Sequence, residues 1–151
     1  MVSLITPSMT NLSIIILSYN TAKLTLSCIE SLVAHYEKEF TEKIFEIIVV
    51  DNNSSDNSVA TIETSQLSSF VHLIKNEHND GFAKGINLGA SQAIGEYLLF
   101  LNSDTKVHDA GLIDMVTFLK KNPDVGIVGG RLQNPDGSYQ ASAGVFYTVP
   151  R

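Results

Sequence analysis

Short runs of β-branched and other apolar residues, separated by amphipathic stretches, constrain the fold of this 151-residue chain more than any other feature. Residues 12–17 (LSIIIL) and 45–50 (FEIIVV) are typical of strands that are covered on both faces of a sheet. Residues 71–75, 96–101 (EYLLFL) and 125–129 (VGIVG) are three further candidates. The sequence therefore predicts five strands.

Helical patterns separate these runs. The first helix is predicted between the first two runs, and Asn20 or Thr21 would cap it. A looser pattern after the second run predicts a second helix, and residues 81–94 and 110–120 predict a third and a fourth. The first helix is predicted from apolar residues that recur at spacings of three and four: Leu24, Cys28, Ile29, Leu32 and Val33.

An alternation of strands and helices predicts an α/β fold, with a mostly parallel sheet, right-handed crossovers and helices on both faces. In such sheets, ligands bind beyond the carboxyl ends of the strands. Asn134-Pro135-Asp136-Gly137 is a strong turn signal, so residues 131–143 should form a hairpin. We expect an N-terminal tail at 1–11, an α/β domain at 12–130, and the hairpin with the start of a further part at 131–151.

Charge and cysteine content narrow the classes of function. Ten Lys and Arg against 16 Asp and Glu give a formal net charge of −6, which disfavours nucleic acid as a partner. The single cysteine, Cys28, lies in a helical pattern and favours a reducing compartment. Residues 1–10 lack the build of a secretory signal, and no apolar run reaches the ~18 residues of a membrane-spanning helix. We therefore expect a cytoplasmic protein, or one held peripherally at the inner face of the membrane.

Polar clusters directly follow three of the predicted strands. Asn, Asp and Ser are also common turn formers and helix caps, so any one cluster has an ordinary structural explanation. Three clusters at one edge of a sheet favour a binding site, because polar groups at the ends of buried strands need partners. The clusters are Ser18-Tyr19-Asn20, Asp51 to Asp56 (including Asn53 and Ser54), and Asn102-Ser103-Asp104.

Asp104 is the most informative of these residues. A carboxylate at a strand end suits Mg²⁺ or Mn²⁺, which takes one or two protein carboxylates and fills its remaining positions with water and substrate phosphates. Such a metal would offset the charge of a diphosphate bound to an acidic protein. The structural alternative is that Asp104 caps a turn.

Three glycines, Gly81, Gly85 and Gly89, recur every four residues and would form one bare ridge on a helix. Each costs about 1 kcal/mol relative to alanine in a helix interior, so a ligand or a strand should approach this backbone closely. The spacing matches neither the dinucleotide-binding glycine motif nor the phosphate-binding loop. The four histidines show no metal-ligand spacing, and no serine or cysteine lies in a recognisable nucleophile elbow.

Taken in order, five segments resemble the N-terminal, nucleotide-sugar-binding part of family 2 glycosyltransferases of the GT-A fold, in particular the rhamnosyltransferase-like branch. The resemblance extends over residues 12–144. Its segments are IIILSYN (14–20), IIVVDNNSSD (47–56), NDGFAKGINLGA (79–90), GEYLLFLNSDT (95–105) and VGIVGGRLQNPDG (125–137).

The resemblance implies a role for each matching position. Ser18 and Tyr19 would line the base pocket, and Asp51 would contact the base or ribose. Asn102-Ser103-Asp104 would stand for the metal motif D-x-D, with asparagine at its first position and Asp104 as the metal ligand. The full set of donor-binding residues expected is Ser18, Tyr19, Asn20, Asp51, Asn53, Ser54, Asn79, Gly81, Lys84, Asn87, Asn102 and Asp104.

The implied partners are a UDP-, dTDP- or GDP-sugar donor, Mg²⁺ or Mn²⁺, and a saccharide or lipid-linked saccharide acceptor in cell-surface polysaccharide synthesis. Inverting members of this family need a carboxylate base in an acceptor-side motif. No carboxylate after Asp104 has that context, so we expect the base beyond residue 151 and a donor-binding piece that is inactive by itself. An apolar face left for the remaining part could also promote self-association into a homo-oligomer.

Two alternatives stay open at this point. The chain could be a non-catalytic nucleotide-sugar-binding or interaction module that has kept the fold. It could also be a phosphatase with Asp51 as nucleophile, because that chemistry begins with an aspartate after an apolar strand. Phosphatases of this kind need a second aspartate two positions later, where this chain has Asn53.

Overall fold

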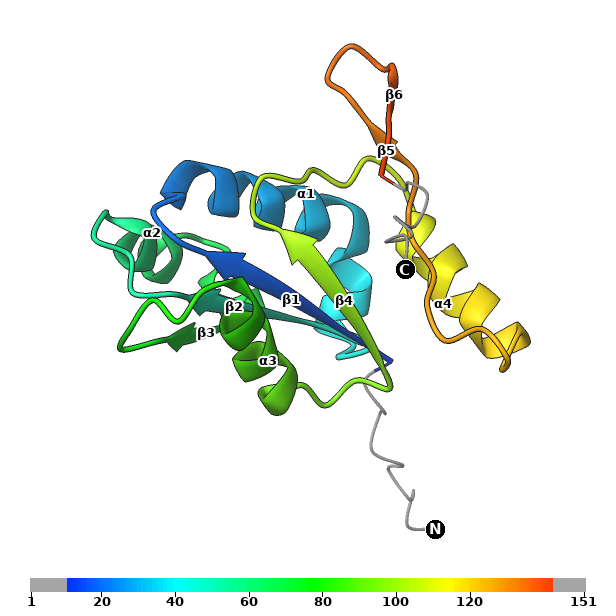
Figure 1. Cartoon of the computed structure of the whole chain (residues 1–151), viewed down its shortest axis with the longest axis horizontal. Coiled ribbons are helices and arrows are strands. Elements are labelled where there is room, and N and C mark those ends of the chain that lie inside the picture. Colours follow the sequence, from blue (N-terminus) through cyan, green and yellow to red (C-terminus); the bar gives the residue numbers. More distant parts are fainter. Residues whose placement is uncertain (1–10, 143–151) are drawn as a thin grey trace, which may run out of the picture. The chain divides into compact units, whose positions relative to one another are not determined.

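The computed structural model describes residues 11–142. These residues form two compact units, one that ends at Ala110 and one that starts at Gly111. The first unit contains the sheet and the helices that cover it (Figure 1). The second unit contains a helix and a hairpin.

The first unit is built on a four-stranded sheet in the order β3-β2-β1-β4. Every neighbouring pair of strands in this sheet is parallel. The central strands β1 and β2 are apolar along most of their length, because both of their faces are covered. The strands are β1 (Leu12–Ser18), β2 (Phe45–Asp51), β3 (Val71–Lys75) and β4 (Tyr97–Asn102), which confirms the first four predicted runs to within one residue.

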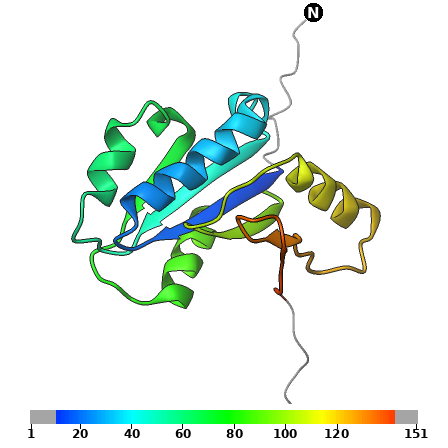
Figure 2. The same cartoon turned by 90° about the horizontal axis from the view of Figure 1, so that it is seen from above.

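Helices cover both faces of this sheet. Figure 2 shows α1 (Ala22–Thr41) and α2 (Ser58–Thr64) on one face and α3 (Phe82–Gln92) on the other. Thr21 is the N-cap residue of α1, one of the two caps predicted, and a short 3-10 helix, η1 (Ser68–Phe70), precedes β3. The predicted α/β architecture with helices on both faces is confirmed.

The core lies on both faces of the sheet, between α3 and the central strands and between α1 and those strands. Cys28, Ile29 and Leu32 of α1 are fully buried, as their helical spacing predicts. Backbone angles at Tyr36 (φ −133°, ψ 24°) kink the helix. The Tyr36 ring packs 5.5 Å from that of Phe45, and its hydroxyl donates to the carbonyl of Asp109 at 2.8 Å. A buried aromatic ring with a satisfied hydroxyl thus fixes the bend.

Glycines let α3 lie close to the sheet. A Cβ atom at Gly89 would come within 2.5 Å of Cγ2 of Ile15, and one at Gly85 would come within 2.4 Å of Cδ1 of Leu17. Of the two neighbours predicted for the glycine ridge, a ligand or a strand, the structure shows strand β1 at Gly85 and Gly89. Gly81 has a different function, because it precedes the helix with φ 81° and has open space around it.

The second unit consists of α4 (Gly111–Lys121) and a hairpin formed by β5 (Leu132–Gln133) and β6 (Tyr139–Gln140). The two strands are antiparallel, and Gly137 takes φ 82° in the turn. The predicted hairpin is confirmed over the described residues; Ala143 lies outside them.

One predicted strand is wrong. Residues 125–129 are not a strand in the described structure, and Ile127 is 90% exposed. Apolar residues alone do not make a strand, since a strand needs a neighbour to pair with, and the glycines here weaken the extended conformation further.

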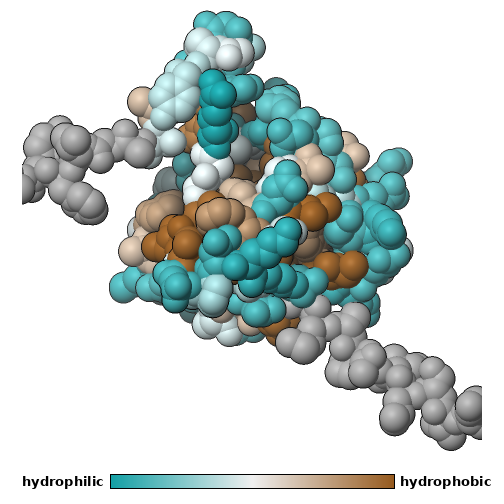
Figure 3. All heavy atoms as spheres, turned by 90° about the vertical axis from the view of Figure 1, so that its right-hand side faces the viewer, coloured by the Kyte–Doolittle hydropathy of each residue, from teal (hydrophilic) through white to brown (hydrophobic). Residues whose placement is uncertain are grey.

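Large apolar side chains also reach the surface, including Leu98 and Phe100 of β4, which are 44% and 53% exposed. Figure 3 shows apolar atoms among polar neighbours on one side of the molecule. Within residues 11–142, no helix combines the length and the apolar character needed to cross a membrane.

Candidate active site

The carboxyl ends of β1, β2 and β4 meet at one edge of the sheet. In the parallel register, Ser18 of β1 lies opposite Asp51 of β2, and Leu17 lies opposite Asn102 of β4. The backbone N–H of Asn52 continues this pairing by donating to the carbonyl of Ser18 at 2.8 Å. The structure therefore brings the three polar clusters to the same edge, as the apolar runs before them predict.

A cavity of about 290 Å³ opens at this edge. It lies between the loop after β1, the loop after β4 and the start of α3. Tyr19 stands 48% exposed on one side of it and Phe82 61% exposed on another. Its lining residues are Leu17, Tyr19, Thr21, Leu24, Phe82, Asn102, Ser103 and Asp104. The two aromatic rings suit a ligand that has a planar part, and the carboxylate suits a cation rather than an anion.

Asp51 is buried at the same edge, with 2% of its surface exposed, and it is not among the residues that line the cavity. Its Oδ2 accepts a hydrogen bond from the backbone N–H of Ser54 at 2.9 Å. Its Oδ1 is also buried but has no hydrogen-bond partner among residues 11–142. A buried carboxylate oxygen without a donor is costly for the protein alone, and a ligand N–H or O–H group would relieve that cost.

The loops after β1 and β2 are joined by their own polar groups. Oδ1 of Asn20 accepts from the N–H groups of Ser55 (2.8 Å) and Asp56 (3.3 Å), and the N–H of Asn20 donates to Oγ of Ser54 (2.9 Å). Asn20 and Asn53 adopt the left-handed conformation, with φ 55° and 64°. The predicted binding residues Asn20 and Ser54 thus have structural partners inside the protein.

The hydroxyl of Ser18 is directed into the protein as well. Ser18 is fully buried, and its Oγ lies 2.9 Å from Oγ1 of Thr25 and 3.2 Å from Oγ1 of Thr21. These contacts attach the end of β1 to the first turn of α1. The next residue, Tyr19, is the one that lines the cavity.

A chain of amide groups joins the ends of β2 and β3 to the start of α3. Asn52 donates to Oδ1 of Asn79 at 2.8 Å and accepts from Nδ2 of Asn76 at 3.0 Å. Sequence reasoning missed Asn52 and Asn76. The available signal was the position of Asn52, because a residue that extends an apolar strand by two positions is expected to be buried and therefore to need partners.

Two predicted residues lie on the exposed surface of α3. Nζ of Lys84 lies 3.6 Å from Oδ1 of Asp80, and Asn87 is exposed. Neither residue is among those that line the cavity. Such an exposed i,i+4 ion pair contributes little to stability, so Lys84 can turn toward a ligand at low cost.

With this geometry described, comparison with known proteins identifies the family. The model of glycosyl transferase family 2 matches residues 13–147, which is most of the chain. The chain belongs to glycosyl transferase family 2. This confirms the family that the five sequence segments resemble. The rhamnosyltransferase-like branch stays a prediction.

Curated relatives of this family 2 chain are longer proteins. It is 34% identical over 128 residues to the poly-beta-1,6-N-acetyl-D-glucosamine synthase of Staphylococcus epidermidis, covering 82% of this chain and 29% of the synthase. It is 31% identical over 137 residues to the glycosyltransferase GlyG of Streptococcus pneumoniae, covering 90% of this chain and 42% of GlyG. The chain thus spans less than half the length of either relative.

Solved structures agree on the fold. TarS 1–349 from S. aureus, solved in complex with UDP-GlcNAc, is 29% identical with a TM-score of 0.65, covering 75% of this chain and 32% of that one. The mannosyltransferase PcManGT from Pyrobaculum calidifontis, solved with GDP-Man and Mn²⁺, has a TM-score of 0.67 at 19% identity, covering 83% and 36%. The predicted GT-A fold of this family 2 chain is therefore confirmed.

The predicted metal motif, Asn102-Ser103-Asp104, begins at the last residue of β4 and continues into the loop that follows. Within the described part of the chain, no group of three or more His, Cys, Asp or Glu side chains could hold a metal ion. A magnesium-like ion can take a single protein carboxylate, with its other ligands from phosphates and water, and Asp104, which lines the cavity, stays the predicted ligand. A single carboxylate does not fit a zinc-like site, which needs three or four protein ligands.

The same loop lies near the buried thiol of Cys28, whose Sγ is 3.8 Å from the carbonyl oxygen of Asn102. Burial raises the pKa of Cys28 to about 12, and the negative charge of Asp104 adds to this effect. The thiol is therefore protonated at neutral pH. It serves as a packing residue rather than a nucleophile, as its place in the helical pattern predicts.

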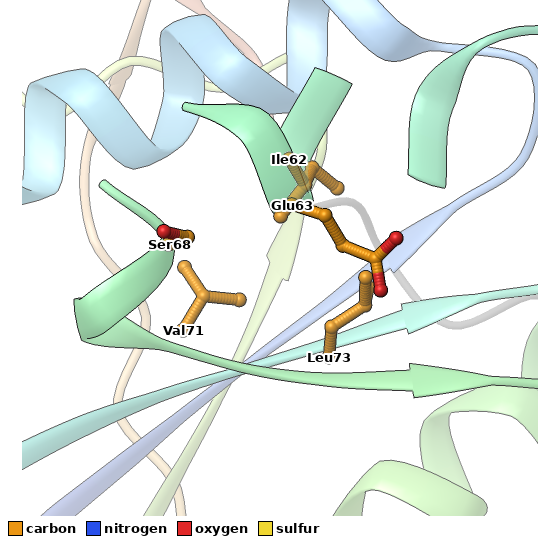
Figure 4. Close-up of a pocket in the computed structure, with 5 residues that line it drawn as sticks. All are labelled: Ile62, Glu63, Ser68, Val71 and Leu73. Atoms are coloured by element: carbon orange, nitrogen blue, oxygen red, sulfur yellow. The ribbon is translucent and has the colours of Figure 1, made fainter. Parts of the chain in front are cut away.

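A second cavity, of about 390 Å³, lies elsewhere on the family 2 chain. Figure 4 shows Ile62 and Glu63 of α2 close to Val71 and Leu73 of β3, with Ser68 beside them. The one charged side chain, Glu63, is paired with Lys75 at 2.6 Å between Oε1 and Nζ. No lining residue comes from the carboxyl ends of the strands, so this cavity is a poorer candidate for a donor site.

Proposed function

We propose that this chain binds a nucleoside diphosphosugar at the carboxyl edge of its sheet and serves as the donor-binding part of a glycosyltransferase. The unpartnered Oδ1 of Asp51 is the observation that carries the proposal. A nucleobase or ribose offers an N–H or O–H donor for this oxygen, and Tyr19 on the cavity wall offers a ring against which a base can stack.

Two related structures support this ligand class. TarS 1–349 has been solved with UDP and with UDP-GlcNAc, at 28% and 29% identity to this chain. The base, the sugar and the acceptor of this protein are not assigned by that similarity. UDP, dTDP and GDP are the nucleotides to test, and a saccharide or lipid-linked saccharide is the acceptor class that we propose for the whole enzyme.

Asp104 would hold Mg²⁺ or Mn²⁺ together with the diphosphate. A bound metal ion would neutralise charge on the departing diphosphate when the sugar is transferred to an acceptor hydroxyl. The chain's own residues would bind and orient the donor: Asp51 and Tyr19 at the nucleoside, and Lys84 with Asn87 near the sugar or diphosphate. Transfer also needs a base for the acceptor hydroxyl, which we do not assign within residues 11–142.

Calorimetry with UDP, dTDP and GDP in the presence of Mn²⁺ tests the proposal. We expect at least one nucleotide to bind the wild-type chain. Asp51→Asn should weaken this binding by roughly tenfold. It places an amide N–H where Oδ1 would accept a hydrogen bond from the nucleotide, while the remaining oxygen keeps the hydrogen bond from the N–H of Ser54. Glu37→Gln, an equal change of charge at an exposed position of α1, should bind like wild type.

Absence of binding for all three nucleotides would contradict the proposal, as would equal affinities of Asp51→Asn and wild type. A second assay distinguishes an active donor site from a binding module that has kept only the fold. Slow, metal-dependent hydrolysis of the donor sugar by the chain would favour the active site.

A further inference from the structure

Asn52 occupies a place that a polar side chain rarely holds. It follows β2 directly, next to Asp51, and only 2% of its surface is exposed. Its amide makes hydrogen bonds through both of its ends, from Nδ2 to Oδ1 of Asn79 (2.8 Å) and from Nδ2 of Asn76 to its own Oδ1 (3.0 Å). The buried amide therefore connects segments that are 24 and 27 residues away along the chain.

A backbone group determines the direction of every hydrogen bond in this amide chain. The N–H of Gly81 donates to the side chain of Asn79 at 3.0 Å, and a backbone N–H can only donate. Asn79 must therefore present its oxygen, so Asn52 must present its Nδ2 to that oxygen. Oδ1 of Asn52 is then left to accept from Asn76. An aspartate could replace Asn79 in this arrangement, but it could not replace Asn52.

The amide chain ends at the wall of the candidate donor cavity. Gly81 precedes α3 with φ 81°, and its carbonyl accepts the first helical hydrogen bond, from the N–H of Gly85 at 3.2 Å. The next residue, Phe82, is the aromatic side chain that α3 contributes to the cavity. Residues 77–82 are exposed, so buried contacts of their own side chains do little to hold them.

We infer that Asn52 is a positioning residue of the donor site, which holds Asn79, Gly81 and the first turn of α3 against the end of β2. This inference rests on the proposed function, since it concerns how the cavity wall is held for the nucleotide. It assigns a function to a buried residue that is not among those that line the cavity. Asn52 acts through Asn79 and Gly81 on the placement of Phe82.

Amide hydrogen exchange of the unliganded chain provides the first test. In Asn52→Asp, the Asn79 amide must turn over to donate to the new carboxylate, so the Gly81 N–H loses its acceptor and should exchange at least tenfold faster. In Asn79→Asp, both oxygens accept, and the Gly81 amide should keep its protection. Amides of β1 and β2 should stay protected in both variants, which shows that the sheet is folded.

Nucleotide affinity provides the second test, because a merely structural residue would leave it unchanged in the folded protein. At a temperature at which all variants are folded, Asn52→Asp and the uncharged Asn52→Leu should both bind the nucleotide roughly tenfold more weakly than wild type. Asn57→Asp adds the same charge at an exposed position close in the chain and should bind like wild type. Asn76→Ala removes one bond from a half-buried position and gives a milder variant if the changes at Asn52 prevent folding.

Faster exchange at Gly81 with wild-type affinity would mean that Asn52 is only structural, and would overturn the inference. Unchanged exchange in Asn52→Asp would overturn it as well. If the wild-type chain binds none of the nucleotides, the proposed function fails, and with it the link to the donor; the exchange experiment then decides alone whether Asn52 holds this loop.

Discussion

Oδ1 of Asn20 accepts a hydrogen bond from the backbone N–H of Ser55 at 2.8 Å, although 35 residues separate the two in the chain. The parallel register explains this contact, because it places the ends of β1 and β2 next to each other. Asn20 also adopts φ 55°, a conformation that asparagine tolerates better than most residues. Asn20 therefore joins two loops of the candidate site and can stabilise them without contacting the ligand.

Substitutions at Asn20 should separate its two contributions to stability. Asn20→Gly keeps the backbone conformation and loses the side-chain hydrogen bonds, so we expect the free energy of unfolding to fall by about 1 kcal/mol. Asn20→Ala also incurs the strain of the left-handed conformation, which adds about 1 kcal/mol. Denaturant unfolding measures both, and a glycine variant less stable than the alanine variant would contradict this explanation.

Gly89→Ala should destabilise the sheet unit. The new Cβ would lie 2.5 Å from Cγ2 of Ile15 and 3.1 Å from that of Val50, both inside the core. Overpacking of this kind costs ~1–3 kcal/mol, against a gain of ~1 kcal/mol in helix propensity, so we expect a net loss of up to ~2 kcal/mol. Gly126→Ala is the matched control, since nothing lies within 4 Å of its added Cβ. An equal effect of both substitutions on the denaturation midpoint would contradict the packing argument.

Cys28 should react with a thiol reagent only when the protein unfolds. Burial and the charge of Asp104 raise its pKa from 9.0 to about 12, so the reactive thiolate is disfavoured in the folded state. For the same reason the group stabilises the fold fully below pH 9.0, and this contribution is lost as the pH rises toward about 12. Reaction rates with and without denaturant check the first statement, and unfolding curves across this pH range check the second. Rapid labelling of Cys28 in the folded chain at neutral pH would be inconsistent with a buried thiol of raised pKa.

Removal of the metal should weaken nucleotide binding only when Asp104 is present. We expect the wild-type chain to bind its nucleotide roughly tenfold more tightly with Mn²⁺ than with a chelator, because Asp104 would hold an ion that offsets the charge of the diphosphate. Asp104→Asn should bind with one affinity under both conditions, and Glu37→Gln should behave like wild type. A metal effect that survives in Asp104→Asn would assign the ion to another residue.

Much of the fold could be predicted because it depends on local patterns. The runs that became β1 to β4 are apolar enough to be recognised without neighbours, and the spacing of Cys28 and Leu32 revealed the buried face of α1. Residues 125–129 are also apolar enough to predict a strand, but they do not form one. A strand also depends on a pairing partner, and such a partner is not visible in the composition of the segment.

For the candidate site, the amino-acid sequence alone determined which residue types follow each strand and therefore which loops to consider. Only the tertiary structure decided how those residues are used. It placed Tyr19 and Asp104 on one cavity wall, left Oδ1 of Asp51 without a donor, and engaged Asn20 with the neighbouring loop. The physical reason is that a hydrogen bond depends on which two groups come within about 3 Å, and for residues 24 to 35 positions apart only the folded backbone determines that distance.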